Sequence, residues 1–347
     1  MPDADELPHL SVIIPAYNSE SSIARTVRSV LAQASGEIEV LVVDDGSDVD
    51  PSSVLAQYIA TGRCRVLRQA NLGASVARNH GFQVARAALV MFVDADDELV
   101  DGSLIPFLRS AQESRADVTI SDFYLSDGDS MQLVPAVNSE EKDFGESARI
   151  VLQRLTLARI GFGGKANIGL LGAPWAKIYQ KDFLVRAFGR DELFTPGVLR
   201  GQDVLFNTEV FGKAQAVHYF RQASYVYSVN SDSASHSVAV DFVSRVTTLG
   251  RAVEGLILRH GWTSLMPALA KMTVTLLEEA MQRRGRALKI ADVRQLLQRE
   301  MFRHAVRGSQ LRDFSLVGRV KLLAYRAGSI PTYVLMKSLV LVRRAGR

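Results

Sequence analysis

The chain has 347 residues, 47% of them hydrophobic, which is enough to bury one large core or two medium ones. Its single cysteine, Cys64, excludes an internal disulfide, and no Cys/His spacing is typical of a zinc site, so any bound metal must use oxygen ligands. The acidic N-terminus lacks the features of a secretory signal, and no apolar run reaches the roughly 18 residues that span a bilayer. We therefore expect a cytoplasmic protein that does not span a membrane.

The net charge of +4 conceals a strong asymmetry along the chain. Residues 240–347 contain 20 Lys and Arg against 7 Asp and Glu, a net charge of +13. The preceding residues contain 21 against 30, a net charge of −9. The two parts of the chain are therefore expected to face different partners.

Apolar, β-rich runs alternate with helix-length segments over the first 125 residues. Five strands are predicted, at residues 11–17, 38–45, 64–69, 88–96 and 117–125. Because these runs are almost continuously apolar, they favour a parallel sheet that is covered by helices on both faces. Ligands of such sheets bind at the carboxyl ends of the strands, where residues 15–18, 44–47 and 94–97 are polar.

The remainder of the chain is irregular at first and then helical. Residues 126–200 give no confident strands, and the glycines of 161–172 indicate a mobile or ligand-facing loop. From Asp241 onward, leucine-rich amphipathic segments such as 264–284 and 290–307 predict a separate helical C-terminal region.

A cluster of carboxylates, Asp94-Ala95-Asp96-Asp97, ends the fourth predicted strand. Carboxylates held this close repel one another unless a cation lies between them. Mg²⁺ and Mn²⁺ prefer such oxygen ligands and commonly take one or two protein carboxylates together with phosphate oxygens. The cluster thus indicates diphosphate binding, although an acidic strand end followed by a helix cap would give the same short pattern. Asp97 is open between a metal ligand and a helix cap.

Five motifs together give a more specific indication. They are SVIIPAYN (11–18), VLVVDDGSD (40–48), NLGASVARNHG (71–81), MFVDADD (91–97) and GQDVLF (201–206). In this order and at these spacings the chain resembles family 2 glycosyltransferases, in particular bacterial enzymes of cell-surface and cell-wall polysaccharide synthesis. The resemblance covers roughly residues 8–235. It implies an α/β GT-A fold, with a Rossmann-like, mostly parallel central sheet and flanking helices, followed by the helical region. The implied domains are 1–238, whose acceptor side is about 126–238, and 239–347.

The resemblance also implies a binding site for a nucleotide-sugar donor. Its residues are Pro15, Ala16, Tyr17, Asn18, Asp45, Asn71, Gly73, Arg78, Asp94 and Ala95. Asp45 would accept a hydrogen bond from the base, which favours uracil and a UDP-sugar, although a carboxylate in Asp-Gly-Ser is also a common turn residue. Arg78 would neutralise diphosphate charge, and its alternative is a solvated helix arginine.

Catalytic and acceptor residues follow from the same resemblance. Asp203 matches the general base of an inverting transfer, although an acid here is also typical of a helix N-cap or first turn. Gln202 replaces the family's usual Glu, from which we expect altered acceptor recognition. The expected metal, Mn²⁺ or Mg²⁺, would bind Asp96 and Asp94, with His236 as a third ligand. Trp175 and Lys177 would lie on the acceptor side, with Trp175 either stacked on a sugar or buried in the core.

The sequence specifies the acceptor, other partners and the cellular location less closely than the donor site. The acceptor is expected to be a glycan, an anionic polymer or a lipid-linked molecule. Residues 315–347 contain seven Lys and Arg and no acid among apolar clusters, a composition typical of helices that lie on anionic membranes. A helical cap on the first domain or a contact in a homo-oligomer fits equally well. We expect a cytoplasmic protein, peripheral on the inner face of the cell membrane in the first case.

Other classes of protein are less favoured. The basic region carries no nucleic-acid recognition motif, and no Gly-x-Gly-x-x-Gly of a dehydrogenase follows the first strand. A catalytically silent GT-A scaffold, or a protein that only binds an anionic polymer or membrane, remains the alternative, with Gln202 as its only hint.

Overall fold

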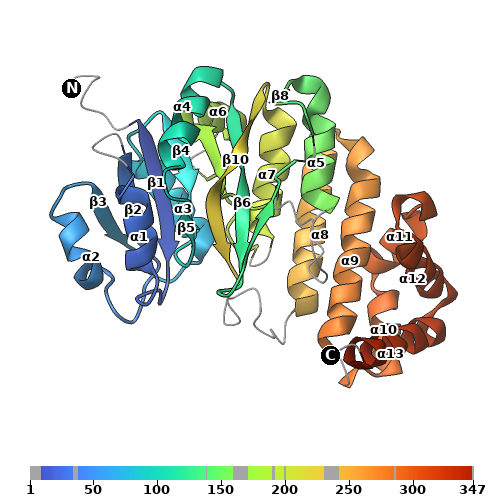
Figure 1. The fold of residues 1–347 in the computed structure, drawn as a ribbon. Coiled ribbons are helices and arrows are strands. Elements are labelled where there is room, and N and C mark those ends of the chain that lie inside the picture. The colour runs from blue at the N-terminus through green and yellow to red at the C-terminus, as the bar shows by residue number, and fades with distance from the viewer. Residues whose placement is uncertain are drawn as a thin grey trace. The chain divides into compact units, whose positions relative to one another are not determined.

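The computed structural model describes residues 9–33, 38–137, 139–158, 171–189, 192–198, 201–229, 242–284 and 287–345 (Figure 1). The chain divides into two compact units. The first comprises residues 1–152 and 166–236, and the second comprises 153–165 and 237–347. The predicted boundary between residues 238 and 239, and most of the glycine-rich loop predicted at 161–172, lie outside the described residues.

A single mixed sheet forms the centre of the first unit. In spatial order its main strands are β3 (Cys64–Arg68), β2 (Ile38–Asp44), β1 (Leu10–Ala16), β4 (Leu89–Phe92), β9 (Lys177–Gln180), β6 (Val118–Ser126), β10 (Val217–Ser228) and β5 (Glu98–Leu99), while β7 (Met131–Val134) pairs with β6 and β8 (Asp143–Phe144) with β10. Strands β3, β2, β1 and β4 are parallel, as are β6 and β10. This confirms the predicted α/β class with a mostly parallel sheet. Strand β9, which runs antiparallel between β4 and β6, was not predicted.

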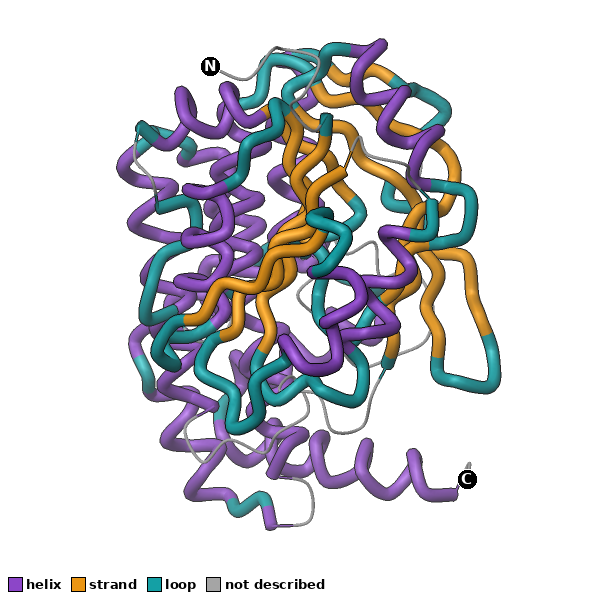
Figure 2. The backbone as a smooth tube through the Cα atoms, turned by 90° about the vertical axis from the view of Figure 1, so that its left-hand side faces the viewer, coloured by secondary structure: helices purple, strands orange, loops and turns teal. Residues whose placement is uncertain are grey.

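Helices cover both faces of this sheet, as continuously apolar strands require. The bounds in this unit are α1 (Ile23–Leu31), α2 (Ser52–Ile59), α3 (Ala74–Val84), α4 (Leu104–Ser114), α6 (Lys181–Phe188) and α7 (Gln202–Lys213), with a short 3₁₀ turn at Glu146–Ala148 and α5 (Arg149–Ala158) running into the second unit. Leu10, Val12 and Ile14 of β1 pack in one cluster with residues of α1 and α4. On the opposite face, a Cβ atom on Gly81 of α3 would lie 2.4 Å from a methyl carbon of Ile13, so only glycine permits this close approach. Figure 2 shows the strands as a twisted layer with helices beside it.

An aromatic cluster holds α7 against this second face. Phe206 of α7 stacks on Phe194 with ring centroids 4.3 Å apart, and Phe92 of β4 meets Phe194 edge to face at 5.2 Å. Tyr179 of β9 and Phe188 of α6 complete the cluster. Aromatic pairs in these geometries stabilise a core beyond their burial. The start of α7 is therefore fixed relative to the carboxyl end of β4.

The second unit is helical in its described part, which confirms the predicted helical C-terminal region. Its helices are α8 (Phe242–Arg259), α9 (Met266–Arg284), α10 (Ile290–Gln298), α11 (Glu300–Gly308), α12 (Leu316–Ala327) and α13 (Ser329–Ala345), with 3₁₀ turns at Thr263–Leu265 and Leu311–Asp313. Buried aliphatic side chains such as Leu249, Leu276 and Leu277 form its core. No helix in the described ranges is both long and apolar enough to cross a membrane.

Candidate active site

Three polar strand ends lie along one edge of the sheet. Residue pairing in the parallel ladder sets Ala16, at the end of β1, beside Asp44, at the end of β2. Strand β4 lies on the other side of β1, and the Val93 amide donates to the carbonyl of Ile13 at 3.0 Å. The segments 15–18, 44–47 and 94–97 are thereby brought together, as parallel strands with matched registers require.

At the end of β1 the backbone adopts an unusual conformation, and Tyr17 is exposed there. Asn18 has a φ of 47°, and its side chain exchanges two hydrogen bonds with Asp48, of 3.1 Å and 2.9 Å. Tyr17 is 50% exposed, Pro15 is half-buried and Ala16 is buried. Tyr17 thus presents an aromatic ring at this edge, while Ala16 belongs to the core.

Asp45 clamps the loop that precedes α3. One carboxylate oxygen accepts from the Gln69 side chain and the Leu72 amide, both at 2.9 Å, and the other accepts from the Gly73 amide at 2.8 Å. Gly46 has a φ of 79°, and a Cβ atom on it would lie 3.0 Å from the Asn71 nitrogen. The turn after β2 and the loop before α3 are therefore in contact. Asn71, in that loop, is exposed. Asp45 holds this loop in place, and a contact with a base stays a prediction.

The carboxylates of the acidic cluster separate into two environments. Asp97 is fully buried and accepts hydrogen bonds from the Tyr225 hydroxyl at 2.6 Å and the Ser228 amide at 2.8 Å. Its burial, with the nearby charges of Asp94 and Asp96, raises its pKa well above the ordinary value. Asp97 is thus neither a helix cap nor accessible to a metal. Asp94 and Asp96 are partly exposed at the same turn.

Helix α1 and strand β10 fix the backbone of that turn. The Ala95 carbonyl accepts from the hydroxyls of Ser22 and Thr26 at 2.8 Å and 2.9 Å. The Tyr225 hydroxyl, which donates to Asp97, accepts from the Asp94 amide at 3.1 Å. The Ala95 carbonyl therefore anchors the turn to α1. The hydroxyl of Tyr225 anchors the same turn to β10.

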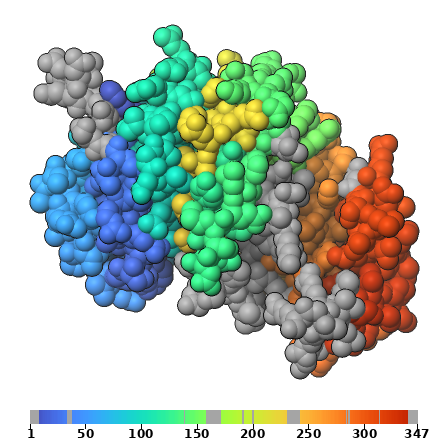
Figure 3. All heavy atoms as spheres, viewed as in Figure 1, coloured from blue at the N-terminus to red at the C-terminus, as the bar shows by residue number. Residues whose placement is uncertain are grey.

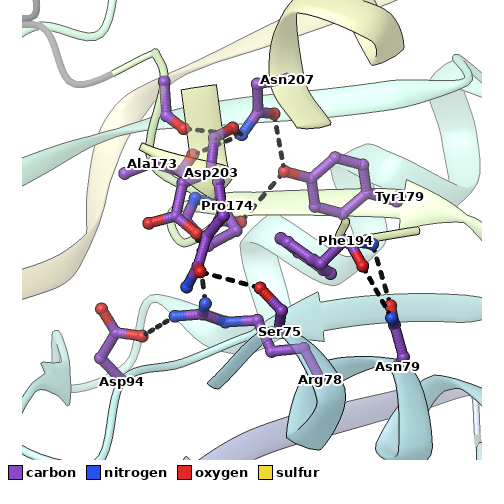
Figure 4. A network of polar contacts seen from close by, with 12 residues as sticks. Ser75, Arg78, Asn79, Asp94, Ala173, Pro174, Tyr179, Phe194, Asp203 and Asn207 are labelled. Carbon is purple, nitrogen blue, oxygen red and sulfur yellow. Dashed lines mark hydrogen bonds and ion pairs between the residues drawn. The ribbon is translucent and has the colours of Figure 1, made fainter. Parts of the chain in front are cut away.

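Arg78 joins the acidic cluster to α7. Its guanidinium donates to Asp94 at 2.7 Å and to Asp203 at 3.1 Å, and Figure 4 shows it between the two carboxylates. Only 5% of its side chain is exposed, and its guanidinium carbon lies 5.3 Å from the Phe194 ring centroid. Burial acts to lower the pKa of Arg78, but the charges of Asp203 and Asp94 outweigh it and raise the pKa. The alternative of a solvated helix arginine is therefore wrong.

Asp203 lies in the first turn of α7, after Gly201, which occupies the N-cap position. Its side chain is 33% exposed. Protein atoms around the carboxyl group exclude most of its hydration water, which raises the pKa of Asp203 above the ordinary 3.8. The positive charge of Arg78 opposes that rise. The preceding residue, Gln202, accepts a hydrogen bond from the Ser75 hydroxyl at 2.8 Å. A glutamine can take part in this contact without adding a further charge beside Asp203.

Side chains from β9 and α7 support Asp203 from behind (Figure 4). The Asn207 amide donates to the carbonyls of Gly172, Ala173 and Asp203 at 2.9–3.1 Å. The Tyr179 hydroxyl donates to the Pro174 carbonyl at 3.0 Å and to the Asn207 side chain at 3.1 Å. Sequence reasoning missed both residues and Ser75. Only their spacing could have indicated them. Asn207 lies one helical turn after Asp203, and Tyr179 lies two residues after Lys177 in the same strand, so each shares a face with a predicted site residue.

Trp175 and Lys177 lie in the same buried layer as Tyr179. Trp175 is buried and stacks on Tyr225 with ring centroids 4.7 Å apart, which supports the core alternative and not stacking on a sugar. Lys177 is buried as well, and its ammonium group donates to the carbonyls of Ala173 and Trp175 at 2.6 Å and 3.3 Å. Burial lowers the pKa of Lys177 to about 7, and Asp203 limits the fall. Both residues are therefore buried, Lys177 near Asp203, and a contact of either with an acceptor stays a prediction.

Two of the three predicted metal ligands, Asp94 and Asp96, lie among the described residues. The described ranges contain no group of three or more Asp, Glu, His and Cys side chains that could hold an ion, and His236 lies outside them. Asp94 and Asp96 are partly exposed carboxylates, and their negative charges add to the rise in the pKa of Asp97. A donor set of two carboxylates fits a Mg²⁺ or Mn²⁺ ion that takes its other ligands from phosphate and water.

Comparisons with known proteins agree with the motifs and the fold. Residues 11–165 match the profile described as "Glycosyl transferase family 2". The chain is 31% identical over 231 residues to the uncharacterized glycosyltransferase YibD of Escherichia coli (strain K12), and 28% identical over 229 residues to EpsJ of Bacillus subtilis (strain 168). Each alignment covers 65% of this chain and 63% of the relative, so the chain spans under two thirds of these proteins.

A solved structure matches more of the chain. S. aureus TarS 1–349 in complex with UDP-GlcNAc aligns with a TM-score of 0.65 over 97% of this chain and 92% of the other, at 19% identity. At this identity the likeness shows the fold alone. It confirms the GT-A-like arrangement followed by helices that the sequence predicts.

Proposed function

We propose that the protein is an inverting glycosyltransferase of family 2, whose profile residues 11–165 match. It transfers a sugar from a nucleotide-diphosphate donor to an acceptor hydroxyl. The carrying observation is that one buried guanidinium, that of Arg78, contacts both Asp94 at the carboxyl end of β4 and Asp203 on α7. Donor-side and acceptor-side carboxylates thus lie within the span of a single side chain.

The donor is proposed to bind along the three strand ends. The exposed ring of Tyr17 offers a surface on which a base can stack. Helix α3 begins after Gly73, whose φ is 93°, and the amides of its first turn together with Arg78 offer donors to a diphosphate. UDP-sugars are favoured because S. aureus TarS, which shares the fold, is described in complex with UDP-GlcNAc.

The chemical step is a direct displacement. The acceptor oxygen forms a bond to the anomeric carbon, the bond from that carbon to the diphosphate oxygen breaks, and Asp203 takes the hydroxyl proton. The raised pKa of Asp203 suits a general base, because proton affinity increases with pKa. The attack comes from the side opposite the leaving group, so the configuration inverts. The acceptor class stays as predicted: a glycan, an anionic polymer or a lipid-linked molecule.

A divalent ion, Mn²⁺ or Mg²⁺, is proposed to bind at Asp96 and Asp94, with His236 as a further ligand. Such an ion would neutralise charge on the departing nucleoside diphosphate. Arg78 already contacts Asp94 and so contributes fixed positive charge at the same place. The reaction is proposed to occur in the cytoplasm, as the sequence predicts.

Thermal stability measured with UDP-, GDP-, dTDP- and CMP-sugars, with and without Mn²⁺, tests the donor assignment. A ligand that binds only the folded state raises the melting temperature with its concentration. We expect UDP-sugars to give the largest rise, and Mn²⁺ to increase it. If no nucleotide-sugar stabilises the protein, the donor proposal fails.

The variant Asp203→Asn tests the general base. We expect turnover to fall by about 10²–10⁴-fold while UDP-sugar binding is retained, because Asn cannot take the hydroxyl proton but its side-chain oxygen can still accept the hydrogen bond from Arg78. Asp182→Asn is the matched control, since Asp182 is an exposed acid in the first turn of α6, as Asp203 is in α7. Donor binding without turnover in the unaltered protein would instead identify a catalytically silent scaffold.

A further inference from the structure

Exposed aliphatic side chains concentrate in one stretch of the second unit. Seventeen large hydrophobic residues are exposed among the described residues, and six of them fall within 316–334. They are Leu316, Val317, Val320, Leu323, Ile330 and Val334. Isolated exposed aliphatic residues are ordinary on protein surfaces, but a cluster this dense indicates a surface that another body covers.

Helix α12 presents these residues on one face. At 100° per residue, Leu316, Val320 and Leu323 fall within a narrow arc that Val317 widens, whereas the buried Leu322 and Tyr325 lie on the opposite side. The helix thus buries one face in its own unit and leaves an aliphatic face in solvent. Helix α13 continues the pattern with exposed Ile330 and Val334, while Thr332 and Met336 are buried.

The sequence that carries this face is strongly basic. Residues 301–345 contain nine Lys and Arg and a single acid, Asp313. Arg319 and Arg326 of α12, one heptad apart, are both exposed and flank the aliphatic arc. Arg326 donates to the carbonyl of Val306, which places the C-terminal end of α11 and its exposed Arg307 beside α12. The segment from residue 301 onward is orange-red in Figure 3.

We propose that α12, together with the first turns of α13, docks on a membrane surface that contains anionic lipid. Aliphatic side chains would enter the boundary between headgroups and acyl chains, while the exposed Arg307 and Arg319 reach the phosphates. This combination also decides against two other occupants. A second copy of the same face would bring its own positive charge against this one, and a polyanion in water gains nothing from exposed leucine and valine.

Flotation of the full-length protein with vesicles tests the proposal. We expect binding to vesicles of phosphatidylcholine with about one third phosphatidylglycerol, and little binding to phosphatidylcholine alone. The double variant Val320→Asp/Leu323→Asp should lose binding at least tenfold. Leu258→Asp, at an exposed position of α8, is the matched control and should bind as the unaltered protein does. Replacing Arg307 and Arg319 by Gln should weaken binding roughly fivefold per charge removed.

Three outcomes would overturn the proposal. The first is no flotation with anionic vesicles at low salt. The second is binding that high salt abolishes but the double Asp variant leaves unchanged, which would identify a purely electrostatic polyanion site. The third is a dimer in light scattering that the double Asp variant converts to a monomer, which would identify self-association. Each result is independent of sugar transfer, which is measured separately on a soluble acceptor.

Discussion

Arg78 is the residue on which the proposed chemistry depends most. It lies on α3, contacts one carboxylate 16 residues later and another 125 residues later, and is almost wholly buried. A planar guanidinium with several fixed donors can serve two carboxylates at once. Without it, Asp94 and Asp203 would face each other with no intervening cation, which would make both harder to ionise.

We predict that Arg78→Lys lowers turnover by about 100-fold while the protein stays folded, because an ammonium group holds one carboxylate well but not both in register. Steady-state kinetics and circular dichroism check this. Arg86→Lys is the control, since Arg86 also pairs with a carboxylate, that of Glu39, away from the site. Unchanged turnover in Arg78→Lys would mean that the bridge does not position the base.

Lys177 gives the site a measurable dependence of stability on pH. Folding lowers its pKa from 10.5 to about 7, so between these values the unfolded chain holds a proton that the folded chain does not. The free energy of unfolding therefore rises with pH over that window. Its carbonyl partners at Ala173 and Trp175 are the contacts that keep the side chain inside.

We predict that the unfolding free energy of the unaltered protein rises between pH 7 and pH 9 by about 1–3 kcal/mol more than that of Lys177→Met, which cannot titrate there. Urea unfolding at the two pH values measures the difference. Lys142→Met, at an exposed position, should keep the rise of the unaltered protein. Parallel pH profiles for the unaltered protein and Lys177→Met would show that Lys177 is not the cause.

At the scale of elements, the donor edge is assembled by one close contact between two loops. The turn after β2 and the loop before α3 meet at Gly46 and Asn71, and Asp45 secures them with three hydrogen bonds. Since both segments border the proposed nucleotide site, any displacement of one should alter the start of α3 and hence donor binding.

We predict that Gly46→Ala destabilises the protein by about 2–3 kcal/mol and weakens UDP binding, because a methyl group meets both a positive φ and the Asn71 backbone. Gly62→Ala is the matched control, with a φ of 72° and open space around the new methyl group. It should cost about 1 kcal/mol and leave UDP binding unchanged. Chemical unfolding and calorimetric titration distinguish the two. Equal effects of the two substitutions would show that the contact between Gly46 and Asn71 does not support donor binding.

Across the whole molecule, the two units carry the two proposed activities separately. The described residues of the donor and base sites all belong to the first unit, whereas the aliphatic and basic surface of α12 belongs to the second. The charge asymmetry of the sequence follows the same division. Ligands of the two kinds should therefore leave separate footprints on the chain.

Hydrogen exchange measures these footprints. We predict that UDP with Mn²⁺ slows exchange in peptides that cover residues 15–18, 44–47, 69–78 and 94–97, and leaves 316–334 unchanged. Anionic vesicles should slow exchange in 316–334 and leave the strand ends unchanged. Protection of 316–334 by the nucleotide alone would contradict this division of roles.

The sequence by itself determined the α/β architecture with its helical C-terminal region and the motifs that contain the candidate carboxylates. Continuous apolar runs with polar ends favour a parallel sheet buried on both faces, and the positions of β1 and β2 follow from local patterns alone. Strand β4 ends at Phe92, four residues before the predicted end at residue 96. The amphipathic repeats after Asp241 likewise determined a helical region. The carboxylates of Asp94, Asp96 and Asp203 were found because their motifs are local.

Only the tertiary structure decided which polar groups face the site and which support it from within. Asp97 and Asp94 are three residues apart, yet Asp97 is buried against Tyr225 and Asp94 is partly exposed beside Arg78. Trp175 and Lys177 are buried because β9 inserts antiparallel between β4 and β6. Burial and polar contacts depend on segments up to 131 residues apart, and no local pattern of polar and apolar residues records which of them will meet.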